Sequence, residues 1–305
     1  MQHNSTFIQS FIKYYDYPTD AIALFTEVLE KLDNKKSFAR SFDSLIKKFV
    51  SHKAVINASL LNSLEKLAIR MGYSPYTLNF VFLLSLTEYL KKQYTLLGID
   101  DKIYYDTMAD LKYKLLECIE CKGVPGTFVP SWYNGFFRLE RVAYGRFQYE
   151  IRVITDGEYT LKCGRIIKKG DIYLNFHIPS SGVPLTDEIR FASYREAYER
   201  VKNLFPDGKV LFGCHSWLLF PNHREFLPEN LNIIRFMDDF EIVKWNENDT
   251  FKDGWRIFGK DASLPYEKLP KDTRLKKSYA EWLLKGNKTG EGLGFFLFDG
   301  EKIIK

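Results

Sequence analysis

Apolar residues recur at helical spacing through roughly the first 120 residues of the chain. Three such stripes are Ile22–Leu32, Phe42–Val50 and Leu60–Met71. A spacing of three and four residues places these side chains on one face of a helix. The segment 75–97, which begins at a proline, is apolar almost all round near its start and is expected to be central. A further helix is predicted over 105–121. We therefore predict a helical bundle over residues 1–123.

The periodicity changes after the turn-forming segment Gly123–Gly126. From there, β-branched and aromatic residues alternate with polar ones, as in half-buried strands. Strands are predicted over 137–142, 147–153, 159–163, 171–178, 209–219, 241–245, 254–259 and 294–298, and helices over 194–204, 231–239 and 275–284. This mixture predicts an α/β (or α+β) domain with a mixed sheet over residues 124–305.

Two local motifs indicate boundaries within this second half. Ser193 with Glu196 has the form of a capping box that begins the helix 194–204. The repeated glycines of Gly286–Gly294 indicate a flexible loop between a helix and the last strand. A phosphate-binding loop would run from a strand into a helix, which is the reverse order.

Composition narrows the classes of function. The 305 residues are 45% hydrophobic and 27% charged, typical of a globular protein. The net charge of +5, from 44 basic and 39 acidic residues, is too small and scattered to indicate nucleic-acid binding. No apolar run reaches the ~20 residues that cross a membrane. The N-terminal residues do not resemble a signal peptide, so we expect a cytoplasmic protein.

The four cysteines are expected to be thiols, because no export signal is evident. Cys118 and Cys121 form a C-x-x-C pair at the end of a helix. A structural zinc site needs a second pair at suitable spacing, and the chain has none. We therefore interpret this pair as packing residues and predict no metal.

Two predicted strands carry the candidate chemistry. His177 lies near the end of the strand 171–178, and His215 near the end of 209–219. Strand, loop, helix, strand is the unit with which parallel sheets build sites at strand ends. Because side chains alternate between faces, Asn175 shares a face with His177, and Trp217 shares one with His215. We expect these four side chains to line one cleft. Alternatively, each histidine is buried and bonded to a backbone carbonyl.

The loop after the first of these strands, Ser180–Ser181–Gly182, is expected at the mouth of the cleft. Histidine is the usual general base near neutral pH. A covalent mechanism is disfavoured, since Cys214 and His215 are adjacent on a strand and point to opposite faces. The chain also lacks the G-x-S-x-G motif of hydrolases.

Several motifs resemble those of a family of bacterial two-domain proteins. They are His177–Gly182, Cys214–Leu219, Leu227–Phe236, Leu269–Thr273 and Gly290–Gly294. Members have a helical N-terminal domain associated with acyltransferases and a GNAT-like C-terminal domain. The resemblance spans nearly the whole chain, and Cys214–Leu219 is its most specific part.

The resemblance implies a GNAT architecture, in which two neighbouring parallel strands splay apart and acyl-coenzyme A lies between them. Its pyrophosphate would meet the loop before the next helix, here Ser180, Ser181 and Gly182. Two features depart from the usual pattern. GNAT enzymes generally carry Arg/Gln-x-x-Gly-x-Gly/Ala where this chain has Ser180–Thr186, and no tyrosine acid occurs between Tyr198 and Tyr266.

Two hypotheses follow. The first is an acyltransferase that moves an acyl group from acyl-coenzyme A to an amine or hydroxyl of a small molecule. His215 is then the first choice of base and His177 the second, with Ser216 as proton donor to the departing thiolate. The second hypothesis is a binding or regulatory protein that keeps the GNAT-like sheet as a ligand pocket without turnover.

Overall fold

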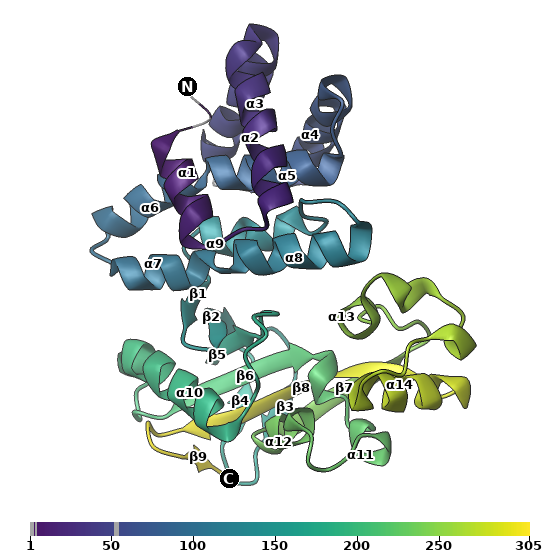
Figure 1. Ribbon diagram of the computed structural model, residues 1–305. Helices are drawn as coiled ribbons and strands as arrows, with labels where there is room; N and C mark the ends of the chain where they lie inside the picture. The colour runs from purple at the N-terminus through teal and green to yellow at the C-terminus, as the bar shows by residue number, and fades with distance from the viewer. Residues whose placement is uncertain (1–2, 4, 52–54) are drawn as a thin grey trace. The chain divides into compact units, whose positions relative to one another are not determined.

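The structure is a computed structural model that describes residues 3, 5–51 and 55–305. The chain folds into two compact units, Met1–Val142 and Ala143–Lys305. Figure 1 shows the helices of the first unit and the sheet of the second, and each unit is described below by itself. Both the helical N-terminal part and the mixed-sheet C-terminal part agree with the predicted fold class.

The first unit is built from helices. They are α1 Thr6–Tyr14, α2 Thr19–Asn34, α3 Lys36–Ser51, α4 Ala58–Met71, α5 Pro75–Ser85, α6 Thr87–Leu96, α7 Asp101–Met108, α8 Asp110–Lys122, the 3₁₀ turn η1 Pro130–Tyr133 and α9 Asn134–Phe137. The apolar stripes are buried as predicted, and α5 is central, with Phe80 and its neighbours fully enclosed. Packing of apolar faces, rather than propensity alone, stabilises helices of this length.

Two predicted helices are each divided. The segment 75–97 breaks at Leu86 into α5 and α6, where the Thr87 hydroxyl donates to the Leu84 carbonyl (2.6 Å). A side-chain hydroxyl that takes a helix carbonyl competes with the backbone ladder. The segment 105–121 is likewise part of two helices, α7 and α8, which meet at Ala109.

The boundary between the units lies at Val142/Ala143 rather than at residue 123. The segment after α8 adds η1 and α9 to the helical unit. The strand predicted over 137–142 is wrong, because α9 ends at Phe137 and only Val142 of this range lies in a strand, β1. The segment after α8 returns to α5, because the Thr127 amide donates to the Tyr76 carbonyl (3.0 Å). Gly126 allows this approach, since a Cβ there would lie 2.4 Å from the carbonyl carbon of Tyr76. Such a long-range contact leaves no periodic signal in the sequence.

The second unit is a sheet with helices packed on it. Its strands are β1 Val142–Tyr144, β2 Phe147–Val153, β5 Ile172–His177, β6 Val210–Ser216, β7 Glu241–Asn248, β8 Thr289–Phe298 and β9 Ile303–Ile304. The order is β1-β2-β5-β6-β8-β7, with β9 beside β8. The β5–β6 pair is parallel and its neighbours are antiparallel, so the sheet is mixed as predicted. A separate hairpin joins β3 Glu158–Thr160 and β4 Ile166–Lys168.

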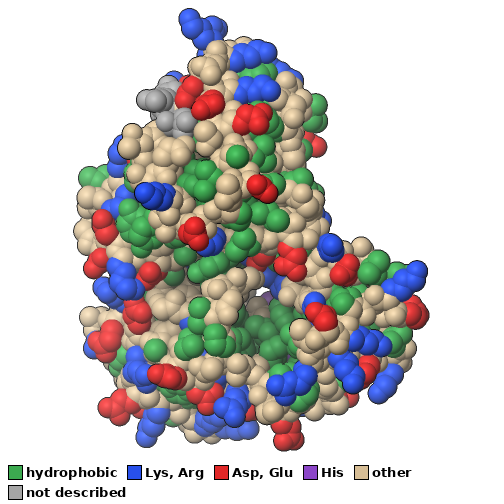
Figure 2. Space-filling model, in the orientation of Figure 1, with side chains coloured by type: hydrophobic (Ala, Val, Ile, Leu, Met, Phe, Trp, Pro, Cys, Tyr) green, Lys and Arg blue, Asp and Glu red, His purple; other side chains and the backbone are tan. Residues whose placement is uncertain are grey.

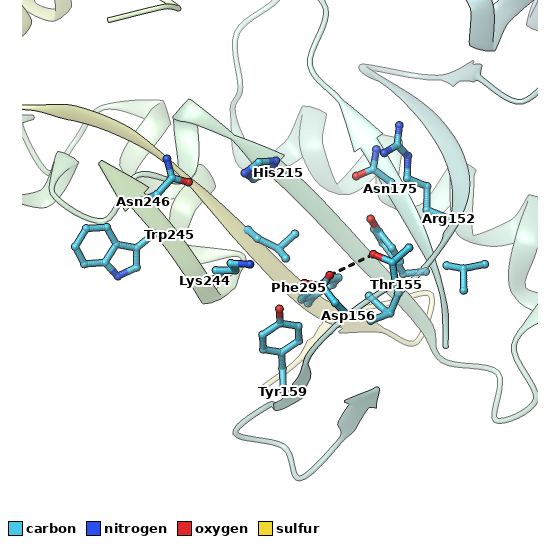
Figure 3. Close-up of a pocket in the computed structure, with 14 residues that line it drawn as sticks. Arg152, Thr155, Asp156, Tyr159, Asn175, His215, Lys244, Trp245, Asn246 and Phe295 are labelled. Carbon is cyan, nitrogen blue, oxygen red and sulfur yellow. Dashed lines mark hydrogen bonds between the residues drawn. The ribbon is translucent and has the colours of Figure 1, made fainter. Parts of the chain in front are cut away.

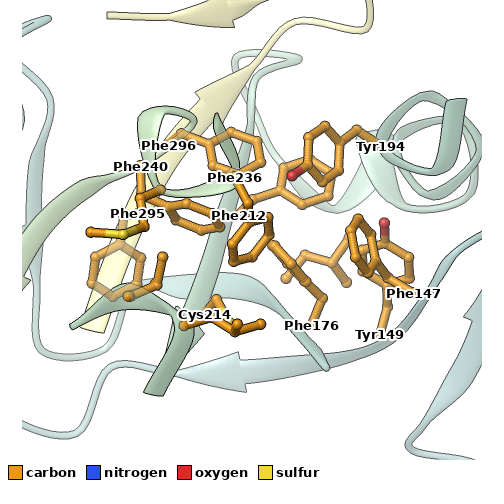
Figure 4. Close-up of a cluster of buried hydrophobic side chains, with 14 of the residues drawn as sticks. Phe147, Tyr149, Phe176, Tyr194, Phe212, Cys214, Phe236, Phe240, Phe295 and Phe296 are labelled. Carbon is orange, nitrogen blue, oxygen red and sulfur yellow. The ribbon is translucent and has the colours of Figure 1, made fainter. Parts of the chain in front are cut away.

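One face of the sheet carries an aromatic core. Phe176, Phe212 and Phe296, from β5, β6 and β8, are buried there. The helices α10 Asp187–Val201 and α12 Asn232–Asp238 contribute Tyr194 and Phe236 to the same cluster, as Figure 4 shows. Face-alternation then places Asn175 and His215 on the opposite face, which we call the open face.

The remaining helical elements follow α10, β6 and β7. They are the 3₁₀ turns η2 Lys202–Leu204, η3 Trp217–Leu219, η4 Gly259–Ser263 and η5 Tyr266–Lys268, and the helices α11 His223–Phe226, α13 Trp255–Phe258 and α14 Arg274–Leu284. The strand predicted over 254–259 is wrong, because α13 occupies it. A run of six residues is too short for periodicity to separate a strand from a helical turn.

The glycine-rich segment 286–294 is mostly strand, not a flexible loop. Gly290, Gly292 and Gly294 lie in β8, two residues apart, so they share one face. A Cβ on Gly292 would lie 2.2 Å from the Leu219 carbonyl oxygen, and one on Gly290 would lie 2.4 Å from the Phe220 ring. These glycines therefore allow η3 and the residue after it to cross directly over the strand.

The predicted capping box is also wrong. The helix α10 begins at Asp187, after Thr186, seven residues earlier than predicted. Ser193 is instead a buried residue inside the helix, and its hydroxyl donates to the Tyr144 carbonyl (2.6 Å). Serine and glutamate at this spacing also occur inside helices, so the motif is not specific to a helix start. Here the serine hydroxyl makes a tertiary contact instead of a cap.

Candidate functional site

The strands β5 and β6 pair with each other over a short stretch only. Their register pairs are Leu174–Phe212 and Asn175–Gly213. Beyond these pairs β5 continues for two residues and β6 for three, each still paired on its other edge with β2 or β8. We call the two described strand ends past Asn175 and Gly213 the arms of an opening, because no register pair joins their inner edges. His177 ends one arm, and His215 with Ser216 ends the other.

His177 is held by a carboxylate on the neighbouring strand. Its Nε2 lies 2.9 Å from Glu150 Oε1, and Asn175 Nδ2 lies 3.1 Å from the same ring nitrogen and 3.2 Å from that oxygen. Arg152 Nε also donates to Glu150 Oε1 (2.6 Å). A carboxylate at one ring nitrogen orients the imidazole and favours the tautomer with its proton there. In the neutral ring, Nδ1 is then the proton acceptor.

His215 has a looser environment. Its side chain is 54% exposed, and its Nε2 lies 3.8 Å from Glu291 Oε1 on β8. The register places it on the same sheet face as Asn175 and His177, as the sequence predicts. It lacks the close carboxylate contact that His177 makes.

Trp217 does not share this face, contrary to expectation. The strand ends at Ser216, whose Oγ accepts from the Leu218 amide (3.1 Å) and so begins the turn η3. Trp217 packs instead with Tyr279 and His223, at ring-centroid distances of 6.1 Å each. In the sequence pattern, a serine such as Ser216 that ends a strand and begins a turn looks the same as one more polar strand residue.

A pocket of about 320 Å³ opens on the open face. Figure 3 shows Asn175 and His215 on one side, Lys244 and Trp245 from β7 on another, and Tyr159 from the β3–β4 hairpin. The expected grouping is therefore met in part. His215 and Asn175 line this pocket, whereas His177 does not line it but contacts Asn175.

The loop between β5 and α10 lies next to the opening. Gly182 has a left-handed backbone (φ 75°), and Ser181 Oγ accepts from the Val183 amide (3.3 Å). Arg146 holds the loop from the start of β2, donating to the carbonyls of Pro179 (2.9 Å) and Val183 (3.0 Å). Ser180 and Gly182 are exposed, so the loop surface is accessible.

Glu150 and Arg152 were missed by sequence reasoning. The strand 147–153 was identified, and its polar residues alternate with Tyr149 and Ile151. The alternation therefore already placed Glu150 on one face of this strand, where it could meet a histidine of a neighbouring strand. What could not be inferred was the antiparallel register that sets Glu150 opposite Asn175.

Neither the charged groups nor the cysteines of the described residues indicate a further site. On the face in Figure 2, basic and acidic side chains are interspersed. Among the described residues, no group of three or more His, Cys, Asp or Glu is arranged to hold a metal, and no helix has the length and apolarity to cross a membrane. All four cysteines are free, and Cys118 and Cys214 are buried.

Comparison with known families matches both halves of the chain. Residues 142–296, about half of the chain, match the model of the GNAT-like C-terminal domain. The chain belongs to this GNAT-like family. Residues 6–139 match the model of the N-acyltransferase N-terminal domain, as the motif resemblance implied. A comparison with curated proteins gives no match.

Solved structures share the fold of the GNAT-like chain. One is an acyltransferase mutant in complex with octanoyl-CoA, with a TM-score of 0.72, 18% identity, and coverage of 95% of this chain and 87% of that one. Another is an acyltransferase in complex with decanoyl-CoA and teicoplanin, with a TM-score of 0.60, 17% identity, and coverage of 94% and 98%. At these identities the likeness shows the fold.

Proposed function

We propose that this GNAT-like protein is an acyltransferase that moves an acyl group from acyl-coenzyme A to an amine or hydroxyl of a small molecule. The observation that carries the proposal is the opening between β5 and β6, whose register ends at Asn175–Gly213. Unpaired strand edges can hydrogen-bond an extended chain such as the amide-containing arm of coenzyme A. Family membership and the acyl-CoA complexes of the structural neighbours support the same substrate.

The loop residues Ser180, Ser181 and Gly182 are proposed to hold the pyrophosphate of coenzyme A. Their hydroxyls and backbone amides suit a phosphate, and the loop precedes the N-terminus of α10, where the helix dipole favours anions. Asp187 in the first turn opposes an anion, although Arg190 pairs with it at 3.0 Å. The fit therefore rests on the loop's hydrogen-bond donors rather than on a net positive charge.

His177 is proposed as the general base, because Glu150 orients its ring. His215, the first choice from the sequence, becomes the second candidate. The imidazole would take the proton of the acceptor amine or hydroxyl, whose nitrogen or oxygen then attacks the thioester carbonyl carbon. As the carbon–sulfur bond breaks, the Ser216 hydroxyl would donate a proton to the thiolate and take one from water in the same step, and the imidazolium would then release its proton to solvent. Ser216 accepts from Leu218, which leaves its own O–H available.

Matched variants test this assignment. We expect His177→Gln to lower kcat by about 10²–10⁴-fold, measured as thiol release from octanoyl-CoA with an amine acceptor, while octanoyl-CoA binding by calorimetry is unchanged. His215→Gln is the parallel variant, and the larger loss identifies the base. Binding of octanoyl-CoA without release of its thiol, whichever acceptor is added, would favour the binding-protein hypothesis. Absence of binding would overturn both coenzyme A use and the role of the loop.

A further inference from the structure

The pocket on the open face adjoins the opening between β5 and β6. His215 and Asn175 line the pocket, and Asn175 is also the last β5 residue paired with β6. We infer that this pocket holds the acyl acceptor, and that the acceptor is a small amine with a flat apolar body and a carboxylate. This inference rests on the proposed function, since it names the second substrate of the same reaction.

Gly213 shapes the floor of the pocket. A Cβ at this position would lie 2.6 Å from the Tyr173 ring and 2.7 Å from the Phe295 ring. The missing side chain lets these two rings meet over β6 at a centroid distance of 5.3 Å, edge to face. Such a pair is a favourable aromatic geometry. The floor is therefore apolar where these rings cover the paired part of the two strands.

A third ring extends this floor into a wall. Tyr159, from the β3–β4 hairpin, lies against Phe295 at a centroid distance of 6.2 Å. With a volume of about 320 Å³, the pocket is at the small end of ligand sites. Its size, and the rings that line this part of it, suit one aromatic or branched apolar group rather than a long chain.

The charged side chains that line the pocket differ in whether they already have a hydrogen-bond or ion-pair partner. Arg152 is paired with Glu150, and Asp156 accepts from the Thr155 hydroxyl (3.2 Å). Lys244, opposite Leu293 in the β7–β8 register, has no ion pair or hydrogen bond from its side chain among the residues that the structure describes. Figure 3 shows it reaching the pocket beside Tyr159.

The distribution of these groups orients the acceptor. A carboxylate would meet the Lys244 ammonium, because opposite charges attract and the other cation is engaged by Glu150. The apolar body would then lie on the rings of Tyr173 and Phe295. The amine would point to the side formed by Asn175 and His215, which is the border of the opening where the acyl group is proposed to arrive.

Matched ligands test the carboxylate preference directly. Tyrosine carries a carboxylate where tyrosinamide carries a neutral carboxamide. The binding of each ligand to the full chain is measured by calorimetry in the absence of acyl-coenzyme A. We expect tyrosine to bind about 5–30-fold more tightly. Lys244→Gln should remove that preference, whereas Lys260→Gln, an exposed lysine outside the pocket, should retain it. Thiol release from octanoyl-CoA with each acceptor should show the same order in kcat/KM.

The outcomes separate this inference from the proposed function. Equal binding of the two ligands, or a preference that survives Lys244→Gln, would overturn the inference. If thiol release still depends on an acceptor, the proposed function stands alone. A Lys244-dependent preference without any acyl transfer would instead keep the pocket assignment and refute the acyltransferase.

Discussion

The buried histidine His223 makes a prediction about stability against pH. It lies in α11, 1% exposed, with its Nε2 hydrogen-bonded to the Tyr279 hydroxyl. The rings of Trp217, Phe220 and Phe226 surround it at centroid distances of 5.6–6.1 Å. Burial lowers the pKa of His223 from 6.5 to about 4, against an opposing backbone hydrogen bond with Leu218.

The lowered pKa sets the direction of the effect. Between about pH 6.5 and pH 4 the unfolded chain binds a proton at His223 that the folded chain does not. The free energy of unfolding therefore falls as the pH drops through this window and levels off below it. The two pKa values correspond to a loss of about 2 kcal/mol at pH 5 and about 3 kcal/mol at pH 4. A unit of this size loses roughly 2–4 °C in Tm per kcal/mol.

The assay compares Tm between pH 8 and pH 5 for the wild type and His223→Gln. Carboxylates that titrate in the same window are common to both proteins, so the difference in slope isolates His223. We expect the variant to be less stable at pH 8 but to lose about 4–8 °C less on acidification. Parallel curves for wild type and His223→Gln would refute the reasoning.

Two further predictions concern stability. Asp239→Ala should cost about 3–5 kcal/mol in denaturant unfolding, because the buried guanidinium of Arg190 loses the buried carboxylate 2.7 Å away and keeps only the exposed carboxylate of Asp187 as a counter-charge. Asp238→Ala, in an exposed ion pair, should cost under about 1 kcal/mol, and equal losses would contradict this account. Gly292→Ala should cost about 1–3 kcal/mol through its clash with a backbone carbonyl. Glu291→Ala, on the opposite face, should cost about 0.5 kcal/mol or less, and a comparable Tm for the two would show that the crossing turn can shift.

Local pattern was sufficient for the two-part architecture, although the strands predicted over 137–142 and 254–259 are absent. Helical stripes followed by alternating strands predicted the two-part architecture, because the apolar periodicity reflects which face of each element is buried. Alternation also predicted that His177 and His215 lie on one face, and the parallel register confirms it. These inferences depend only on geometry within each strand and on adjacency of neighbouring strands.

Tertiary structure decided what those side chains contact. The register of β2 against β5 brings Glu150 to His177, across 27 positions of sequence, whereas His215 on β6 is more than half exposed. The glycines of β8 look like a loop in the sequence. They are glycines because the turn η3 crosses the strand there, and a single sequence does not reveal that crossing. Partner choice between distant strands is a long-range property, set by packing of the whole sheet, and local spacing carries no information about it.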